Sequence, residues 1–179
     1  MVIIQKLLKL SGLMLLSVLF FFLFFSYFPV NAQEKPPRPV GVFLYQNLSF
    51  GAFSQGTMGG TVTISPYGMR YTTGDIVLFT QGWPYFPAIF EIQGNPGTVV
   101  HLQVVRLFPP YHDAELTGNN GGLLMLDLGN YIPGDPIIIT TNPPARTQVS
   151  IGGTLTVSSP IANPPGSYSG IFEVMFIQE

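Results

Sequence analysis

Apolar and polar residues alternate with a period of two along most of the chain after residue 40. In the stretch QVSIGGTLTVSS (148–159), every second residue from Val149 to Val157 is apolar or Gly, and Ser, Gly or Thr fills the positions between them. Shorter alternating stretches cover residues 48–53, 61–65, 88–93 and 100–104. Successive side chains of a strand point to opposite faces of the sheet, so this period predicts half-buried β-strands.

Turn residues separate the alternating stretches at short intervals. The turn signals are Tyr67-Gly68, Thr73-Gly74, Asn95-Pro96-Gly97, Asn119-Asn120-Gly121, Pro133-Gly134-Asp135 and Pro164-Pro165-Gly166. Gly and Asn adopt the backbone conformations that tight turns require, and Pro fixes the first corner of a turn. Short strands joined by such turns predict an all-β, antiparallel fold, and they favour a sandwich over a barrel.

The N-terminal segment has a different pattern. Lys6 and Lys9 precede a Leu/Phe-rich run over residues 10–28, and the small residues of VNA (30–32) follow it. This order is typical of a secretory signal peptide, so we expect residues 1–32 to be a helical leader that is cleaved after residue 32. The apolar run also reaches the ~20 residues that span a bilayer. An uncleaved leader is therefore the alternative, and it is the way in which we expect the chain to contact a membrane.

Charge is scarce beyond the expected leader. Residues 33–40 form a Pro-rich lead, and residues 41–179 are expected to form a single domain. The part from residue 33 onward carries five Lys/Arg and nine Asp/Glu, a net charge of −4, with no basic cluster. Nucleic-acid-binding proteins usually present a basic patch, so we expect no nucleic-acid partner. Cysteine is absent, so packing must stabilise the fold without disulfides.

Ionisable residues are too few and too dispersed to predict chemistry. His101 alternates with the apolar positions of its stretch, so it is expected to face solvent, and His112 lies in the loop FPPYHDAEL. A zinc site needs three or four ligands and a nucleophile needs a base within reach, and no such spacing is present. We therefore expect no enzymatic activity, no catalytic residue, no metal and no cofactor. A weak calcium site is the metal alternative, with oxygen ligands from Asp113, Glu115, Asp127 or Asp135.

Five segments in chain order resemble one known family. They are LSFGAF (48–53), GGTVTISPYGMRYTTGDIVL (59–78), FEIQGNPGTVVHL (90–102), VSIGGTLTVSSP (149–160) and PGSYSGIFEVMF (165–176). This order is similar to the secreted bacterial family called domain of unknown function 4402. The residues that carry the resemblance are Phe50, Gly51, Gly59, Gly60, Gly152, Gly153, Gly166, Tyr168, Gly170, Phe172 and Val174.

The resemblance implies an immunoglobulin-like sandwich exported by a Gram-negative bacterium, with no established activity. Such domains are also distantly similar to spore-coat-U and pilin-type domains, which assemble by strand exchange, although fold does not carry function with it. One departure from the family pattern stands out. The closing strand of the family usually places Thr, Ser or Asn where this chain has Ile171, Met175 and Ile177.

The glycine pairs Gly59-Gly60 and Gly152-Gly153 lie in strand-like runs, where Gly has no side chain to pack. One interpretation is that they form bulges or tight crossings, for example under Tyr168. The alternative is that they let a ligand or a second backbone approach closely.

Three loops set Trp or Tyr beside Pro: GWPYFP (82–87), FPPYH (108–112) and NYIPGDP (130–136). Rigid aromatic rings on loops can stack on sugar rings with little loss of side-chain entropy. The alternative is that they plug the ends of the sandwich. The candidate ligand aromatics are Trp83, Tyr85, Tyr111 and Tyr131.

The closing stretch GSYSGIFEVMFIQE (166–179) is apolar on both faces. Tyr168, Phe172, Val174 and Phe176 form the face expected in the core, and Ile171, Met175 and Ile177 make the opposite face apolar as well. Either the apolar region 122–141 folds over that second face, or another protein chain covers it, since contiguous apolar surface usually marks an interface.

These observations predict an exported structural or adhesive module that acts through protein–protein contacts at the cell surface, in the periplasm or outside the cell, in the narrowest form as a pilin-like subunit. The candidate interface consists of Ile171, Met175 and Ile177, and the expected partners are other subunits or surface proteins. The alternative function is a carbohydrate-binding module that uses the loop aromatics.

Overall fold

The computed structural model describes residues 38–106 and 112–179, together with Phe20. The chain divides into two units, Met1–Pro37 and Arg38–Glu179. The predicted leader, apart from Phe20, and residues 33–37 of the Pro-rich lead lie outside the described residues. Residues 38–40, the rest of that lead, have no regular secondary structure and run directly into the first strand.

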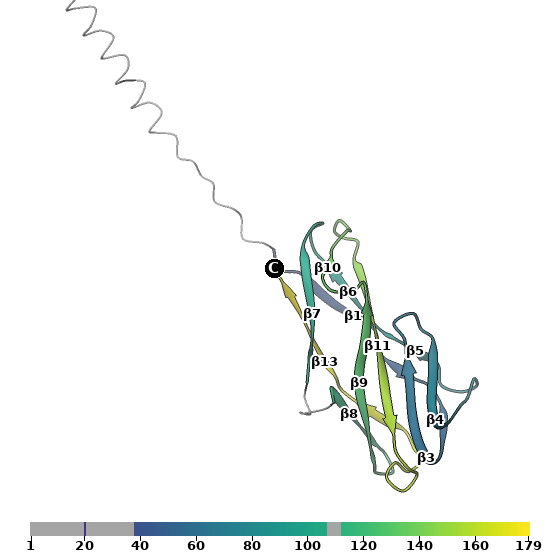
Figure 1. Ribbon diagram of the computed structural model, residues 1–179. Helices are drawn as coiled ribbons and strands as arrows, with labels where there is room; N and C mark the ends of the chain where they lie inside the picture. Colours follow the sequence, from purple (N-terminus) through teal and green to yellow (C-terminus); the bar gives the residue numbers. More distant parts are fainter. Residues whose placement is uncertain (1–19, 21–37, 107–111) are drawn as a thin grey trace, which may run out of the picture. The chain divides into compact units, whose positions relative to one another are not determined.

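Residues 38–106 and 112–179 form strands and turns without a helix, which confirms the predicted all-β, antiparallel sandwich (Figure 1). The strands are β1 (Gly41–Gln46), β2 (Ser49–Phe50), β3 (Phe53–Ile64), β4 (Arg70–Leu78), β5 (Tyr85–Phe86), β6 (Ala88–Gln93), β7 (Val99–Val105), β8 (Ala114–Gly118), β9 (Leu123–Ile132), β10 (Ile137–Ile138), β11 (Thr147–Val157), β12 (Tyr168–Gly170) and β13 (Glu173–Gln178).

The large sheet is organised around β11, the strand with the clearest alternation. The first half of β11, up to Ile151, pairs with β6, and its second half, from Gly153 to Val157, pairs with β3. Its other edge pairs with β9. Strands β8 and β12 continue the sheet beyond β9, β1 continues it beyond β6, and β4 pairs with β3. An antiparallel sheet commonly packs one face on the core, and every residue from Val149 to Val157 on the apolar side of β11 is buried.

The predicted single closing strand is two strands in different sheets. β12 pairs with β8 in the large sheet, and β13 pairs with β7 in a smaller sheet of order β10-β7-β13. Figure 1 shows the yellow segment running from one sheet to the other. The expected strand over residues 48–53 is also interrupted: β2 ends at Phe50, Gly51 adopts a φ of 70°, and β3 begins at Phe53.

Two clusters of buried side chains form the core. One draws on strands of the large sheet together with β2, and its buried members are Phe50, Val62, Ile64, Ile76, Ala114, Leu124, Leu126, Leu155 and Val157. The other lies between the two sheets, and its buried members are Ala88, Ile92, Val100, Ile137, Ile139, Val149 and Ile151. Phe172 packs against both clusters, at the point where the chain changes sheet.

The inner face predicted for the closing stretch is confirmed. Tyr168 packs against the first core cluster, and Val174 and Phe176 pack against the second. The rings of Phe90 and Phe176 lie 5.5 Å apart between the sheets. Both clusters draw only on residues from Val40 onward, so the unit Arg38–Glu179 contains a complete core of its own and is expected to fold without the leader.

The glycine pairs lie at irregularities of the sheet, as the first interpretation predicts. The β3–β4 register shifts between Gln55 and Gly60, and the β11–β9 register shifts between Ile151 and Gly153. A Cβ on Gly152 would collide with the backbone oxygen of Ile64. The suggested aromatic cover is wrong, since the ring of Tyr168 lies where a side chain on Gly118 would be and its hydroxyl lies beside Gly122.

Candidate functional site

The second apolar face of the closing stretch is exposed. Relative exposure is 76% for Ile171 and 46% for each of Met175 and Ile177. We call these three residues the outer stripe. Glu173 lies between the first two and is also exposed, so the stripe is apolar with one charged interruption.

The region 122–141 does not cover the outer stripe, so one of the two covers considered from sequence is excluded. Strand β9 takes up the first part of this region between β8 and β11, and its Leu124 and Leu126 fill the first core cluster. Strand β10 pairs with β7 on the side away from β13, and Ile137 and Ile139 fill the second cluster. Four Leu and Ile residues of this region are thus used in the core, whereas Leu123 and Ile138 are exposed.

Strand β13 pairs with β7 alone among the described strands, so its second edge is free. The N–H of Glu179 donates to the carbonyl of Val99, which continues the β13–β7 ladder. Residues that bond to the partner strand alternate with residues whose backbone groups point the other way. The backbone N–H and C=O groups directed to the free edge therefore belong to Val174, Phe176 and Gln178.

A polar cluster adjoins the outer stripe. The imidazole of His101 on β7 lies 2.9 Å from a carboxylate oxygen of Asp135 and 3.0 Å from one of Glu179. These hydrogen bonds raise the pKa of His101 above 6.5, with Asp135 the larger cause and Glu179 the second. His101 is directly opposite Ile177 in the β13–β7 ladder, so the polar cluster borders the outer stripe at Ile177.

The three candidate ligand aromatics that the structure describes do not gather at one place. Trp83 is 79% exposed, and Tyr85, two residues later on β5, is partly exposed. Tyr131 packs instead against the second core cluster, and its pKa is raised, first by burial and then by the nearby charge of Asp135. Tyr111 lies outside the described residues. Of the three described rings, Trp83 and Tyr85 therefore lie close together in the chain and Tyr131 packs elsewhere.

Arg70 holds the loop that carries Trp83 and Tyr85. Its guanidinium lies 4.1 Å from the centre of the Tyr85 ring and donates to the carbonyls of Phe50 (3.0 Å) and Phe79 (2.7 Å). A planar guanidinium is suited to stacking and to several hydrogen bonds at once. Gly51 is next to this group, and a Cβ there would lie 2.7 Å from the guanidinium, so the Gly of the family motif leaves the space that Arg70 needs.

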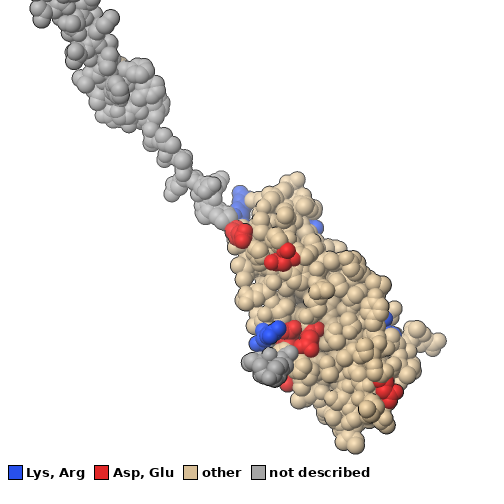
Figure 2. Space-filling view, in the orientation of Figure 1, with Lys and Arg blue, Asp and Glu red and all other residues tan. Residues whose placement is uncertain are grey.

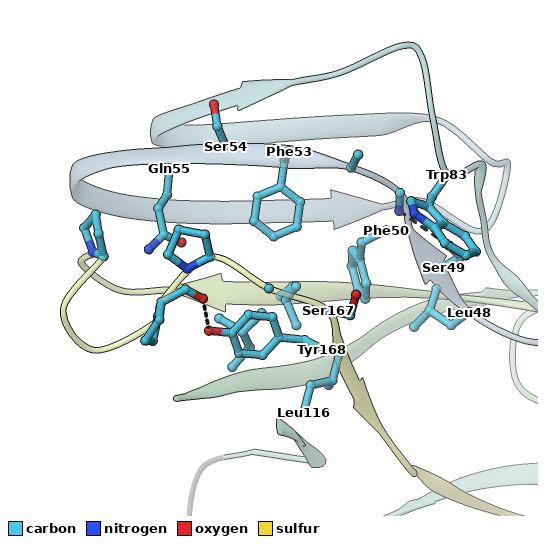
Figure 3. Close-up of a pocket in the computed structure, with 18 residues that line it drawn as sticks. Leu48, Ser49, Phe50, Phe53, Ser54, Gln55, Trp83, Leu116, Ser167 and Tyr168 are labelled. Atoms are coloured by element: carbon cyan, nitrogen blue, oxygen red, sulfur yellow. Dashed lines mark hydrogen bonds between the residues drawn. The ribbon is translucent and has the colours of Figure 1, made fainter. Parts of the chain in front are cut away.

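A cavity of about 720 Å³ opens beside Trp83 (Figure 3). One wall is the segment 48–55, and the opposite wall is formed by Leu116 and the segment 164–168. In Figure 3, the rings of Phe53 and Tyr168 approach each other from the two walls, and Trp83 lies at one end. We call this hollow the Trp83 cavity.

The ionisable residues of the loop before β8 have structural partners. Asp113 is buried, and its carboxylate accepts a hydrogen bond of 2.7 Å from the N–H of Leu128. His112 lies 3.1 Å from Asp127. In the part of the chain that the structure describes, no three His, Cys, Asp or Glu residues are grouped so that they could hold a metal ion. Figure 2 shows that the visible face carries few charged side chains.

Several residues that organise these surfaces have no characteristic pattern in the sequence. Asn163 is 3% exposed, accepts from the N–H of Ser158 and donates to the carbonyl of Leu123, both at 2.6 Å. A lone Asn in a Pro-rich turn, like the single Arg70 in a Thr-rich strand, has no characteristic spacing. The Trp83 cavity depends on two segments more than 100 residues apart, and only the aromatic–proline loop pointed to it.

The fold and its surfaces define an antiparallel β-sandwich with an exposed apolar stripe, a free sheet edge and an uncharged cavity. The family model described as Domain of unknown function (DUF4402) matches residues 42–177, which is most of the chain. The chain therefore belongs to this family. No curated protein and no solved structure matches it. In the described residues, no helix is both long enough and apolar enough to span a bilayer.

Proposed function

We propose that this chain is a non-enzymatic module, exported by a Gram-negative bacterium, that associates with other protein subunits at the cell surface or beyond it. The outer stripe carries the proposal: three large apolar side chains are exposed where the family pattern has polar residues. Exposed contiguous apolar surface on a protein outside the membrane usually marks an interface. In its narrowest form the proposal makes the chain a pilin-like subunit of a surface filament.

The free edge of β13 supports the same surface as the interface. A strand from another subunit that pairs with this edge would satisfy the backbone groups of Val174, Phe176 and Gln178. It would also bring apolar side chains beside Met175 and Ile177. Natural proteins usually blunt free edges with charge or with a covering element. Along β13 itself, Glu173 at the first position is the one charged residue.

Edge strand β1 also exposes apolar residues, so it is the alternative candidate for the interface. Val42, Leu44 and Tyr45 are exposed there. Arg146 stacks 3.8 Å from the ring of Phe43 and pairs with Glu91 at 2.9 Å, so charge lies on the face of β1 that carries Phe43. The pairs of His101 with Asp135 and Glu179 border the outer stripe at Ile177, so both surfaces adjoin charge. We favour β13 as the interface because the three exposed apolar residues of the stripe stand where the family pattern has polar ones.

Sedimentation velocity of residues 33–179 over a wide concentration range tests the proposal. We expect concentration-dependent oligomers, and we expect Ile171→Thr combined with Ile177→Asn to raise the dissociation constant at least about tenfold, equivalent to about 1.4 kcal/mol. Leu44→Thr on β1 is the matched control and should leave the constant unchanged. A strict monomer at the highest concentration, or dissociation by Leu44→Thr alone, would contradict the proposal.

The carbohydrate-binding alternative rests on Trp83, which is the most exposed of the three candidate aromatics that the structure describes. Trp83 is the single Trp of the chain, so its fluorescence reports on this loop without interference. If the alternative holds, a neutral glycan should shift that emission in a saturable way. A flat response across a broad glycan panel would remove it.

A further inference from the structure

The Trp83 cavity reaches side chains of the protein core. Phe50, Leu124 and Leu155 line it, and all three belong to the buried set of the first core cluster. Protein interiors are normally packed with few voids larger than a water molecule. A hollow of about 720 Å³ lies instead within the ~300–1,000 Å³ of sites that hold small ligands. The cavity therefore has the size of a binding site.

The lining carries no charge. Among its 18 residues there is no Asp, Glu, Lys, Arg or His. A charged ligand that moved from water into this cavity would find no opposite charge, and its lost hydration would cost several kcal/mol. The ligand that fits this lining is therefore uncharged.

Three of the five Ser, Gln and Tyr side chains of the lining already donate to partners within the protein. The hydroxyl of Ser49 donates to the backbone carbonyl of Pro84 at 2.7 Å. The side-chain amide of Gln55 donates to the backbone carbonyl of Asn163 at 2.6 Å. The hydroxyl of Tyr168 donates to the carbonyl of Pro164 at 2.6 Å. Sugar hydroxyls that lost water here would find few donors to replace it. Apolar atoms would instead meet the side chains of Phe53, Leu116 and the core residues.

We propose that the Trp83 cavity binds a small, uncharged and mainly apolar molecule, with the indole of Trp83 at its mouth. The binding energy comes from apolar surface removed from water on both the ligand and the lining. This site is separate from the outer stripe, because no residue of the stripe lines the cavity. The two proposals therefore stand or fall separately.

The single Trp makes the site directly measurable. The probe is N-phenyl-1-naphthylamine, an uncharged aromatic dye, added to residues 33–179 while Trp83 is excited. We expect saturable energy transfer from Trp83 to the dye with one dye per chain. Trp83→Phe should abolish the transfer while dye emission under direct excitation persists.

Paired variants locate the dye. Ser167 lines the cavity and is exposed, so Ser167→Phe should fill the mouth without disturbing the core and raise the dissociation constant at least tenfold. Ser169→Phe, at an exposed position two residues along that does not line the cavity, should change it less than twofold. Backbone amide shifts over residues 48–55 in NMR spectra of the unmodified chain provide a second readout, which does not depend on a variant folding.

The proposal is overturned if the dye does not saturate, if Ser167→Phe leaves binding unchanged while folding normally, or if amide shifts cluster at Met175 and Ile177. Displacement of the dye by neutral sugars would also overturn it, since the lining would then be suited to hydroxyl groups. Loss of association in the stripe variants with dye binding intact would leave this proposal standing.

Discussion

At the scale of single residues, side chains that bind backbone groups fix the irregular parts of the fold. Arg70 joins the end of β2 to the residue after β4 through the carbonyls of Phe50 and Phe79. Asn163 joins the end of β11 to the start of β9 through Ser158 and Leu123. These contacts matter because Gly51 and the Pro-rich turns interrupt the ladders that would otherwise hold the chain.

Arg70→Lys should destabilise the fold by about 1.5–3 kcal/mol, the range for hydrogen bonds to charged groups. Lys keeps the charge but cannot reach two carbonyls and stack on Tyr85 at once. Urea unfolding measures the loss, and Trp83 emission should shift to the red as its loop loosens. Arg146→Lys is the control, since its pair with Glu91 is at the surface and is worth less than about 1 kcal/mol. Equal losses in the two variants would contradict this role for Arg70.

His101 should make stability depend on pH. Asp135 and Glu179 raise the folded-state pKa of His101 above the 6.5 of the unfolded chain, so the protonated form is favoured in the fold. This stabilisation is fully present below pH 6.5 and is lost as pH rises through the folded-state pKa. An NMR titration should show a midpoint above 6.5, and Asp135→Asn with Glu179→Gln should return it toward that value. A midpoint at or below 6.5 in the unmodified chain would contradict the assignment.

At the scale of elements, alternation predicts which residues are buried better than it predicts where strands begin and end. The inward positions Val149, Ile151, Leu155 and Val157 are all buried, as their period of two requires. The closing stretch keeps its alternation through Ile171 and Phe172, yet the chain changes sheet there. Side-chain period reports which face is inward and is insensitive to which strand is the neighbour, so the break between β12 and β13 left no sign in the sequence.

The candidate site shows the same limit. The sequence identified the outer stripe correctly as a second apolar face, because that depends on local alternation alone. Whether residues 122–141 cover it depends on which strands β9 and β10 pair with. Those partners, β11 and β7, are distant in the sequence, so local alternation does not reveal them. Trp83 and Tyr131 were grouped because both stand beside Pro, but they belong to different parts of the fold.

Gly152→Ala should show how tightly β11 is packed. The added Cβ would collide with the backbone oxygen of Ile64 and lie 3.0 Å from Pro66, and neither group can rotate away. Overpacking of this kind costs about 1–3 kcal/mol, measurable as a lower thermal midpoint. Gly134→Ala is the control, because no atom lies within 4 Å of its added Cβ. Destabilisation by Gly134→Ala equal to that by Gly152→Ala would contradict the close approach.

At the scale of the whole molecule, the described unit is a sandwich with two core clusters and little surface charge. Its apolar residues are divided between the cores and exposed surfaces, and the outer stripe adjoins a free backbone edge. An apolar surface and unpaired backbone groups at one place are what a second strand would satisfy together. The family match defines what this chain is without defining a function, so the function has to be argued from that surface.

Residue-resolved hydrogen exchange of residues 33–179, at low and at high protein concentration, tests the central claim most directly. The backbone N–H groups of Val174 and Phe176 point to the free edge of β13, so they should exchange rapidly in the dilute protein. Association through this edge should protect them at high concentration, while the amides of Leu44 and Tyr45 on β1 remain unchanged. Rapid exchange of Val174 and Phe176 at every concentration, or new protection confined to β1, would contradict the account.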